Sequence, residues 1–123
     1  MEKQKIWRRE EYYRRTLELL EAYFAVDGWK KLFLNGGCYW LTKFLHRGIR
    51  GSVIMINRVE EHCALAFQQG LYDVTGKIPA GNFHAASQRE ICFMEKNYIP
   101  RFDTQKTEQY LYENLPDNRT VAR

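Results

Sequence analysis

The stretch HCALAFQQGLYDVT, residues 62–75, decides the fold that we predict for this chain of 123 residues. Residues 62–67 alternate between two faces, as the side chains of a β-strand do. The next three residues, Gln68-Gln69-Gly70, are typical of a turn, and residues 71–75 have the composition of a second strand. The centre of the chain is therefore predicted to be an antiparallel hairpin.

The length of the hairpin loop decides whether His62 and Asp73 can meet. If the loop consists of residues 68 and 69, Asp73 is the diagonal, same-face neighbour of His62, about 7 Å away at the backbone. If the loop consists of residues 69 and 70, Asp73 slides along the partner strand and out of reach. Gly70 is compatible with either loop. The sequence therefore leaves two registers open, and only the first brings the two side chains together.

Outward from the hairpin, the sequence predicts one more strand and several helices. The continuous, β-branched run at residues 52–56 favours a strand that is covered on both faces, and residues 76–81, which include Pro79, are predicted as loop. Apolar periodicity and end signals predict helices over residues 5–25, 38–46, 87–99 and 104–115, with a helical or irregular connector at 29–34. The predicted fold class is α+β, a small antiparallel sheet of about three strands packed with N- and C-terminal helices. We expect a single domain over residues 1–116 and a frayed tail over residues 117–123.

The charge of the chain bears on its partners. A net charge of +4 suits an anionic partner such as nucleic acid. Along residues 8–21, however, basic and acidic residues alternate, which favours a solvated helix face with salt bridges. Nucleic-acid binding through this basic N-terminal helix is therefore the less favoured interpretation.

Compartment is indicated by three simple features. No run of residues approaches the roughly 20 apolar residues that a membrane span needs. Residues 1–5 lack the apolar stretch of a signal peptide. The three cysteines have no paired spacing, which is typical of reduced thiols. We expect a cytoplasmic protein with no membrane contact.

Three residues in the middle of the chain have the chemistry of a nucleophilic site. Cys38 follows Gly36-Gly37 at a predicted helix start, where unpaired amides and the helix dipole favour a thiolate, and its own amide would contribute to an oxyanion hole. His62 opens a predicted strand and has the residue type of a general base and acid. Asp73 on the neighbouring strand would orient the imidazole. Each of these residues also has a simpler interpretation, as a buried thiol, a strand-end histidine and a carboxylate bonded to backbone amides.

Two segments around His62 carry a resemblance to a known family. They are GGCYW at residues 36–40 and GLYDVT at residues 70–75. With His62 between them, they resemble the transglutaminase-like branch of the papain-like fold, which has a Cys at a helix start, a His and an Asp-x-Thr strand in this order. The likeness covers residues 35–76. The pattern is also similar to that of short phage and mobile-element proteins.

The resemblance implies a minimal cysteine hydrolase or acyl transferase that acts on a protein or peptide amide through Cys38, His62 and Asp73. Papain-like enzymes use an upstream Gln as oxyanion donor, and here Asn35 would take that role, with Gly37 positioning the Cys38 amide. The likeness to phage proteins implies an alternative, a non-catalytic inhibitor that binds a host protein in the manner of an anti-CRISPR and keeps the same fold.

The other two cysteines and the spacing of possible metal ligands point away from further sites. Cys63 and Cys92 have apolar neighbours and are predicted to lie in the core. The Cys and His residues include no pair two to four residues apart, the spacing that structural zinc usually takes. We therefore predict neither a metal nor another cofactor, although a zinc site assembled from distant elements stays open.

Overall fold

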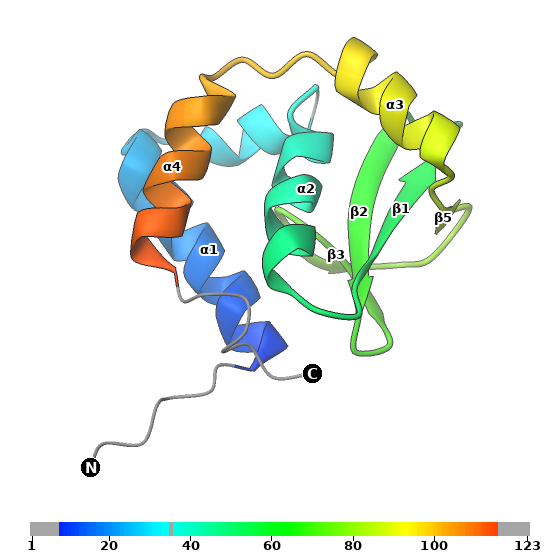
Figure 1. Ribbon diagram of the computed structural model, residues 1–123, viewed down its shortest axis with the longest axis horizontal. Coiled ribbons are helices and arrows are strands. Elements are labelled where there is room, and N and C mark those ends of the chain that lie inside the picture. Colours follow the sequence, from blue (N-terminus) through cyan, green and yellow to red (C-terminus); the bar gives the residue numbers. More distant parts are fainter. Residues whose placement is uncertain (1–7, 35, 116–123) are drawn as a thin grey trace.

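The computed structural model describes residues 8–34 and 36–115, which form an α+β fold (Figure 1). In chain order the elements are α1 (Arg9–Phe24), the 3-10 helix η1 (Trp29–Phe33), α2 (Cys38–Gly48), β1 (Val53–Asn57), β2 (His62–Phe67), β3 (Gly70–Asp73), β4 (Gly76–Ile78), β5 (His84–Ala85), α3 (Gln88–Asn97) and α4 (Thr104–Asn114). The prediction of an α+β class with helices packed on an antiparallel sheet is confirmed. The predicted tail and the start of the first predicted helix lie outside the described residues.

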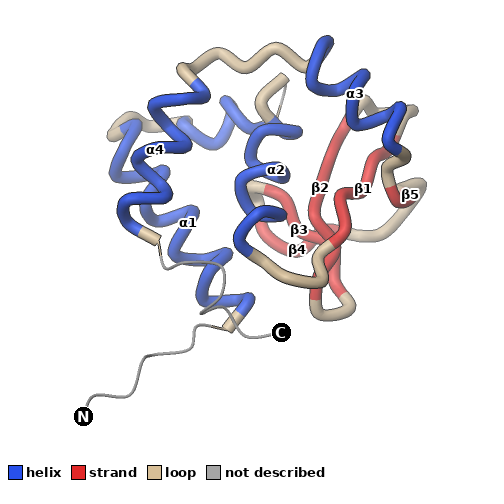
Figure 2. The backbone as a smooth tube through the Cα atoms, in the orientation of Figure 1, coloured by secondary structure: helices blue, strands red, loops and turns tan. Residues whose placement is uncertain are grey.

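The sheet is larger than the sequence predicts. Within the described residues it has five antiparallel strands in the order β4-β3-β2-β1-β5, so the prediction of about three strands is wrong. The predicted loop at residues 76–81 instead begins with β4, which pairs with β3. Residues 79–83 then lead from this edge of the sheet to β5 at the opposite edge (Figure 2).

The register between β2 and β3 follows the first of the two predicted alternatives. Phe67 pairs with Gly70, so the loop consists of Gln68 and Gln69. Both loop residues have left-handed backbone conformations, with φ of 49° and 60°. This is the geometry of a type I′ turn, whose twist matches that of the strands it joins. This register places Asp73 and His62 on the same face of the hairpin.

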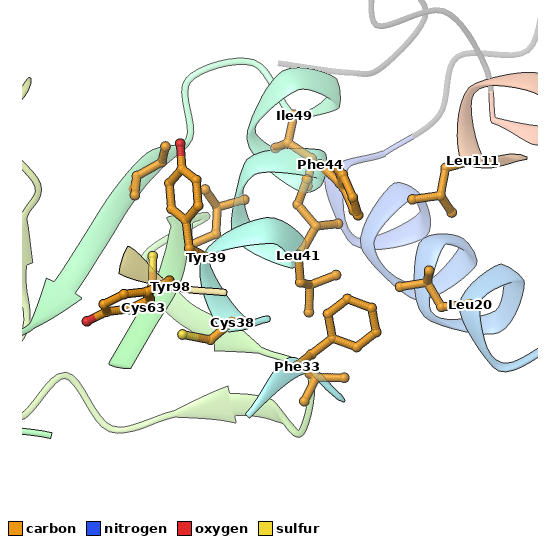
Figure 3. Packing of buried hydrophobic residues seen from close by; sticks show 14 of the residues in the cluster. Leu20, Phe33, Cys38, Tyr39, Leu41, Phe44, Ile49, Cys63, Tyr98 and Leu111 are labelled. Atoms are coloured by element: carbon orange, nitrogen blue, oxygen red, sulfur yellow. The ribbon is translucent and has the colours of Figure 1, made fainter. Parts of the chain in front are cut away.

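Helix α2 is the centre of the helical layer. It packs on the sheet mainly through β2, and α1 with α4 lies on its other side (Figure 1). The buried cluster runs through these layers and includes Leu20, Phe33, Leu41 and Leu111 (Figure 3). Helix α2 therefore carries its first residue, Cys38, into the junction between the helices and the sheet.

Burial of β1 departs from the prediction. Ile54 and Ile56 are buried, whereas Val53 is 43% exposed and Met55 is half-buried. Because side chains alternate along a strand, the helices cover one face of β1 and leave the other face partly open. The prediction of cover on both faces is wrong. No helix in residues 8–34 and 36–115 combines the length and apolar character that crossing a bilayer would require.

Candidate active site

The position of Cys38 is set by the two glycines before it. A Cβ at Gly36 would lie 2.1 Å from the carbonyl oxygen of Ile99, and one at Gly37 would lie 1.9 Å from that of Leu32. Gly37 has a φ of −82°, which any residue can adopt. Glycine is therefore needed here because two backbone segments approach closely, and not because the chain makes a left-handed turn.

The surroundings of Cys38 combine burial with a helix N-terminus. Cys38 is the first residue of α2 and is 2% exposed. The first amides of a helix have no intrahelical carbonyl to bond, and the Cys38 N–H is one of these amides. Gly37 is the N-cap residue of the helix. Asn35, the predicted oxyanion donor, lies outside the described residues.

His62 and Asp73 are in direct contact. Nε2 of His62 lies 2.8 Å from Oδ2 of Asp73, at the adjoining ends of β2 and β3. The other carboxylate oxygen, Oδ1, accepts hydrogen bonds from the backbone N–H of Thr75 at 2.8 Å and from its hydroxyl at 2.5 Å. The Tyr13 hydroxyl of α1 donates to the backbone carbonyl of Asp73. The carboxylate therefore has one oxygen fixed by Thr75 and the other directed at the imidazole.

The imidazole links Asp73 to the thiol. Hydrogen bonds to Asp73 and then to the Cys38 side chain raise the pKa of His62 from 6.5 to about 9, against the opposing effect of burial. For Asp73, burial would raise the pKa, but hydrogen bonds from His62 and Thr75 outweigh it and hold the pKa below its ordinary value. At neutral pH the raised pKa favours an imidazolium that contacts the Asp73 carboxylate and lies near the Cys38 side chain. The structure brings Cys38, His62 and Asp73 together.

Three supporting residues are not among the predicted site residues. Thr75 could be found from sequence, because an Asp followed two residues later by Thr is the spacing of a side chain that bonds the local backbone. Phe83, just before β5, packs edge-on against the His62 ring with the centroids 5.9 Å apart. Its contact depends on the chain crossing the sheet, so no local signal reveals it. The Tyr13 bond from α1 is likewise long-range.

The other two cysteines differ from each other. Cys63 is fully buried, as predicted, and burial together with the nearby Cys38 raises the pKa of its thiol to about 12. Cys92 is exposed on α3, so the prediction that it lies in the core is wrong. Among the described residues, no group of three or more His, Cys, Asp and Glu side chains could hold a metal ion.

A groove of about 750 Å³ opens beside the cluster. Gly36 contributes to it two residues before Cys38, and Glu61 contributes one residue before His62. Its walls come from Leu34 and Gly36, from the β1–β2 connection and from α3 with Tyr98. Apolar side chains of Leu34, Ile56 and Phe93 alternate there with charged ones. The groove therefore adjoins the chain neighbours of Cys38 and His62, although neither of these two side chains lines it.

Fold and site together define an α+β protein with a Cys–His–Asp cluster at the junction of a helix and an antiparallel sheet. The profile of the Phage YunG-like protein family matches residues 16–112, and the chain belongs to this family. The match includes α2 and the five strands, and with them Cys38, His62 and Asp73. No curated protein and no solved structure matches the chain.

Proposed function

We propose that the protein is a minimal cysteine hydrolase or acyl transferase that acts on a protein or peptide amide. The observation that carries the proposal is His62, whose Nε2 lies 2.8 Å from Oδ2 of Asp73 and whose pKa is raised by hydrogen bonding to Asp73 and to the Cys38 side chain. Such a chain of nucleophile, base and orienting carboxylate is what nucleophilic acyl transfer requires. The position of Cys38 at a helix start against an antiparallel sheet also supports a papain- or transglutaminase-like core.

The first half of the reaction uses the imidazolium as an acid. The Cys38 thiolate attacks the carbonyl carbon, and the carbonyl π electrons move to oxygen, where the Cys38 amide stabilises the charge. When the oxyanion collapses, the C–N bond breaks and the leaving amine takes the proton from His62. A thioester to Cys38 and a neutral imidazole remain, and Asp73 holds that imidazole in place.

The second half uses the same imidazole as a base. A water molecule or an acceptor amine attacks the thioester, and His62 removes its proton. The C–S bond breaks, which releases a carboxylic acid after attack by water or a new amide after attack by an amine. Cys38 returns to the thiolate and His62 to the imidazolium. Whether the protein is a hydrolase or a transferase depends on which nucleophile reaches the thioester.

The proposal can be tested without knowledge of the substrate by acylation with p-nitrophenyl acetate. The parent for this test is Cys92→Ser, because the exposed Cys92 would react for reasons of access alone. We expect a stoichiometric burst of p-nitrophenolate and an acetyl group on Cys38, located by peptide mass mapping. Cys63 should stay unmodified, since it is fully buried and its pKa is about 12.

Variants of the cluster separate catalysis from background reaction. Cys38→Ala should abolish the burst, and His62→Gln should slow it by about 100-fold, the usual contribution of a general acid–base group. Acetylation that persists in Cys38→Ala, or the lack of a burst in the Cys92→Ser parent, would overturn the proposal. Circular dichroism of each variant confirms that the fold is kept.

The low exposure of Cys38 supports a second candidate function. A side chain that is 2% exposed is also what a core thiol shows, and membership in a phage protein family fits a stoichiometric inhibitor of a host protein. This candidate predicts that Cys38→Ser leaves the effect of the protein on host cells unchanged. Loss of that effect in Cys38→Ser, with the fold intact, would exclude it.

A further inference from the structure

Tyr98 is held directly against the segment that precedes Cys38. It follows the last residue of α3, and its backbone carbonyl accepts a hydrogen bond of 2.9 Å from Nε1 of Trp40, which lies two residues after Cys38 in α2. The next residue, Ile99, supplies the carbonyl that approaches Gly36. The backbone at Tyr98 is therefore tied to the same helix start that positions the proposed nucleophile.

The Tyr98 side chain lies beside the thiols. Figure 3 shows its ring next to Cys38 and Cys63, and the charge of either thiol acts on its hydroxyl. The residue is only 9% exposed. Burial and, after it, the neighbouring Cys38 raise the pKa of Tyr98 to about 12, so the phenol keeps its proton at every pH of interest. The phenol therefore remains a hydrogen-bond donor.

The hydroxyl has no partner in the part of the chain that the structure describes. Among the described residues, the phenol oxygen of Tyr98 takes part in no hydrogen bond. Every side-chain nitrogen or oxygen there that is fully buried does have a hydrogen-bond partner, which indicates that the phenol oxygen is not fully buried. Tyr98 lines the groove together with Gly36 and Glu61. A phenol in the lining of a groove that has no partner among the described residues is available to a ligand, since buried donors are otherwise satisfied within the protein.

We propose that Tyr98 is a catalytic residue whose hydroxyl donates a hydrogen bond to the oxyanion formed when the Cys38 thiolate attacks a carbonyl in this groove. The inference rests on the proposed function and adds a second oxyanion donor to the Cys38 amide. As the new S–C bond forms, the carbonyl electron pair moves to oxygen, and the phenol stabilises the charge without giving up its proton. Donors fixed in advance at this point act mainly on the transition state.

The test compares two reactions of the same thiol in the Cys92→Ser parent. Acetylation by p-nitrophenyl acetate passes through an oxyanion, whereas alkylation by iodoacetamide displaces iodide and forms none. Tyr98→Phe should therefore slow acetylation of Cys38 by about 100-fold, the effect of removing one oxyanion donor, and leave its alkylation rate unchanged.

Tyr39→Phe is the matched control. It removes a phenol hydroxyl from the residue next to Cys38, but that hydroxyl donates to Oε1 of Glu95 at 2.7 Å. Acetylation should keep its parent rate in this variant.

The outcomes separate the two proposals. Equal slowing of acetylation and alkylation by Tyr98→Phe would show a structural role, and an unchanged acetylation rate would show no role; either result overturns the inference while Cys38 remains a nucleophile. If Cys38 in the parent is alkylated but never acetylated, the proposed function itself fails and the inference with it. Urea unfolding of Tyr98→Phe shows whether the fold tolerates the change.

Discussion

Replacing Asp73 by Asn changes the charge of the site with little change in shape. Oδ1 of Asp73 accepts from the Thr75 N–H and hydroxyl at 2.8 and 2.5 Å, and the Asn side chain keeps both bonds only if its own oxygen takes that place. Its NH2 group then points at Nε2 of His62, where Oδ2 lies 2.8 Å away in the parent. A donor in this place disfavours a proton on Nε2, and hence the imidazolium.

The size of the effect follows from the hydrogen bond that is lost. A hydrogen bond to a charged group contributes about 1.5–3 kcal/mol, and one pKa unit corresponds to about 1.4 kcal/mol. The bond to Asp73 is the largest cause of the raised pKa of His62, which is about 9. In Asp73→Asn we therefore expect this pKa to fall by about one to two units.

The titration can be followed by NMR at the Hε1 proton of each imidazole. His46 is the internal reference, because it bonds Ser52 at the far end of α2 and burial lowers its pKa independently of Asp73. Its titration should be the same in both proteins. The reasoning is refuted if His62 of the parent titrates near 6.5, its ordinary value, or if its titration is unchanged in Asp73→Asn.

Three further predictions concern stability. Because the folded state raises the pKa of His62 from 6.5 to about 9, this residue contributes about 3 kcal/mol of stability. This contribution is fully present below pH 6.5 and is lost as the pH rises through 9. Urea unfolding at both extremes should show a larger loss of stability for the parent than for His62→Gln, and equal losses would contradict the raised pKa. Thr75→Val removes one hydrogen bond to Asp73 and should lower the free energy of unfolding by about 1 kcal/mol at neutral pH. Because the pKa of Asp73 is depressed, this difference should vanish as the pH falls and the carboxylate is protonated. A difference that persists in acid would count against the bond. Gly36→Ala should lower stability by about 3 kcal/mol, because the added Cβ would overlap the neighbouring backbone. Gly51→Ala, with the nearest heavy atom 3.7 Å from the added Cβ and a φ of +76°, should lower it by only about 1 kcal/mol. Equal unfolding midpoints of the two variants in urea would show that Gly36 is not needed for close packing.

The contact between His62 and Asp73 could be anticipated because it depends on local features. Strand β2 begins and ends where the alternation of residues 62–67 predicts. The two-residue loop fixes the register of β2 and β3, and in that register Asp73 is the diagonal neighbour of His62. The sequence did not choose between the two loops, since a left-handed conformation at both Gln68 and Gln69 is uncommon for residues other than glycine.

The errors have a common physical origin, which is that they concern contacts between distant segments. Strands β4 and β5 are three and two residues long, and each exists through pairing with one strand at a sheet edge. Cys92 lies in an apolar run of α3, but consecutive residues of a helix face different directions. Met94 is buried, and Cys92 and Phe93 are exposed. Apolar neighbours alone do not place a helical residue in the core.

The placement of Cys38 shows how much of the chain the site needs. Its helix begins between the carbonyl of Leu32, in η1, and that of Ile99, beyond α3, and each approaches one of the two glycines. The residues with the chemistry of a nucleophilic site all lie within 38–73, yet one wall of the groove comes from α3 and Tyr98, and the Tyr98 carbonyl accepts the bond from Trp40. A thiol at the end of an isolated helix–hairpin unit would lack this wall and the proposed oxyanion donor. The family profile accordingly spans residues 16–112 and is not confined to the segments that carry the chemistry.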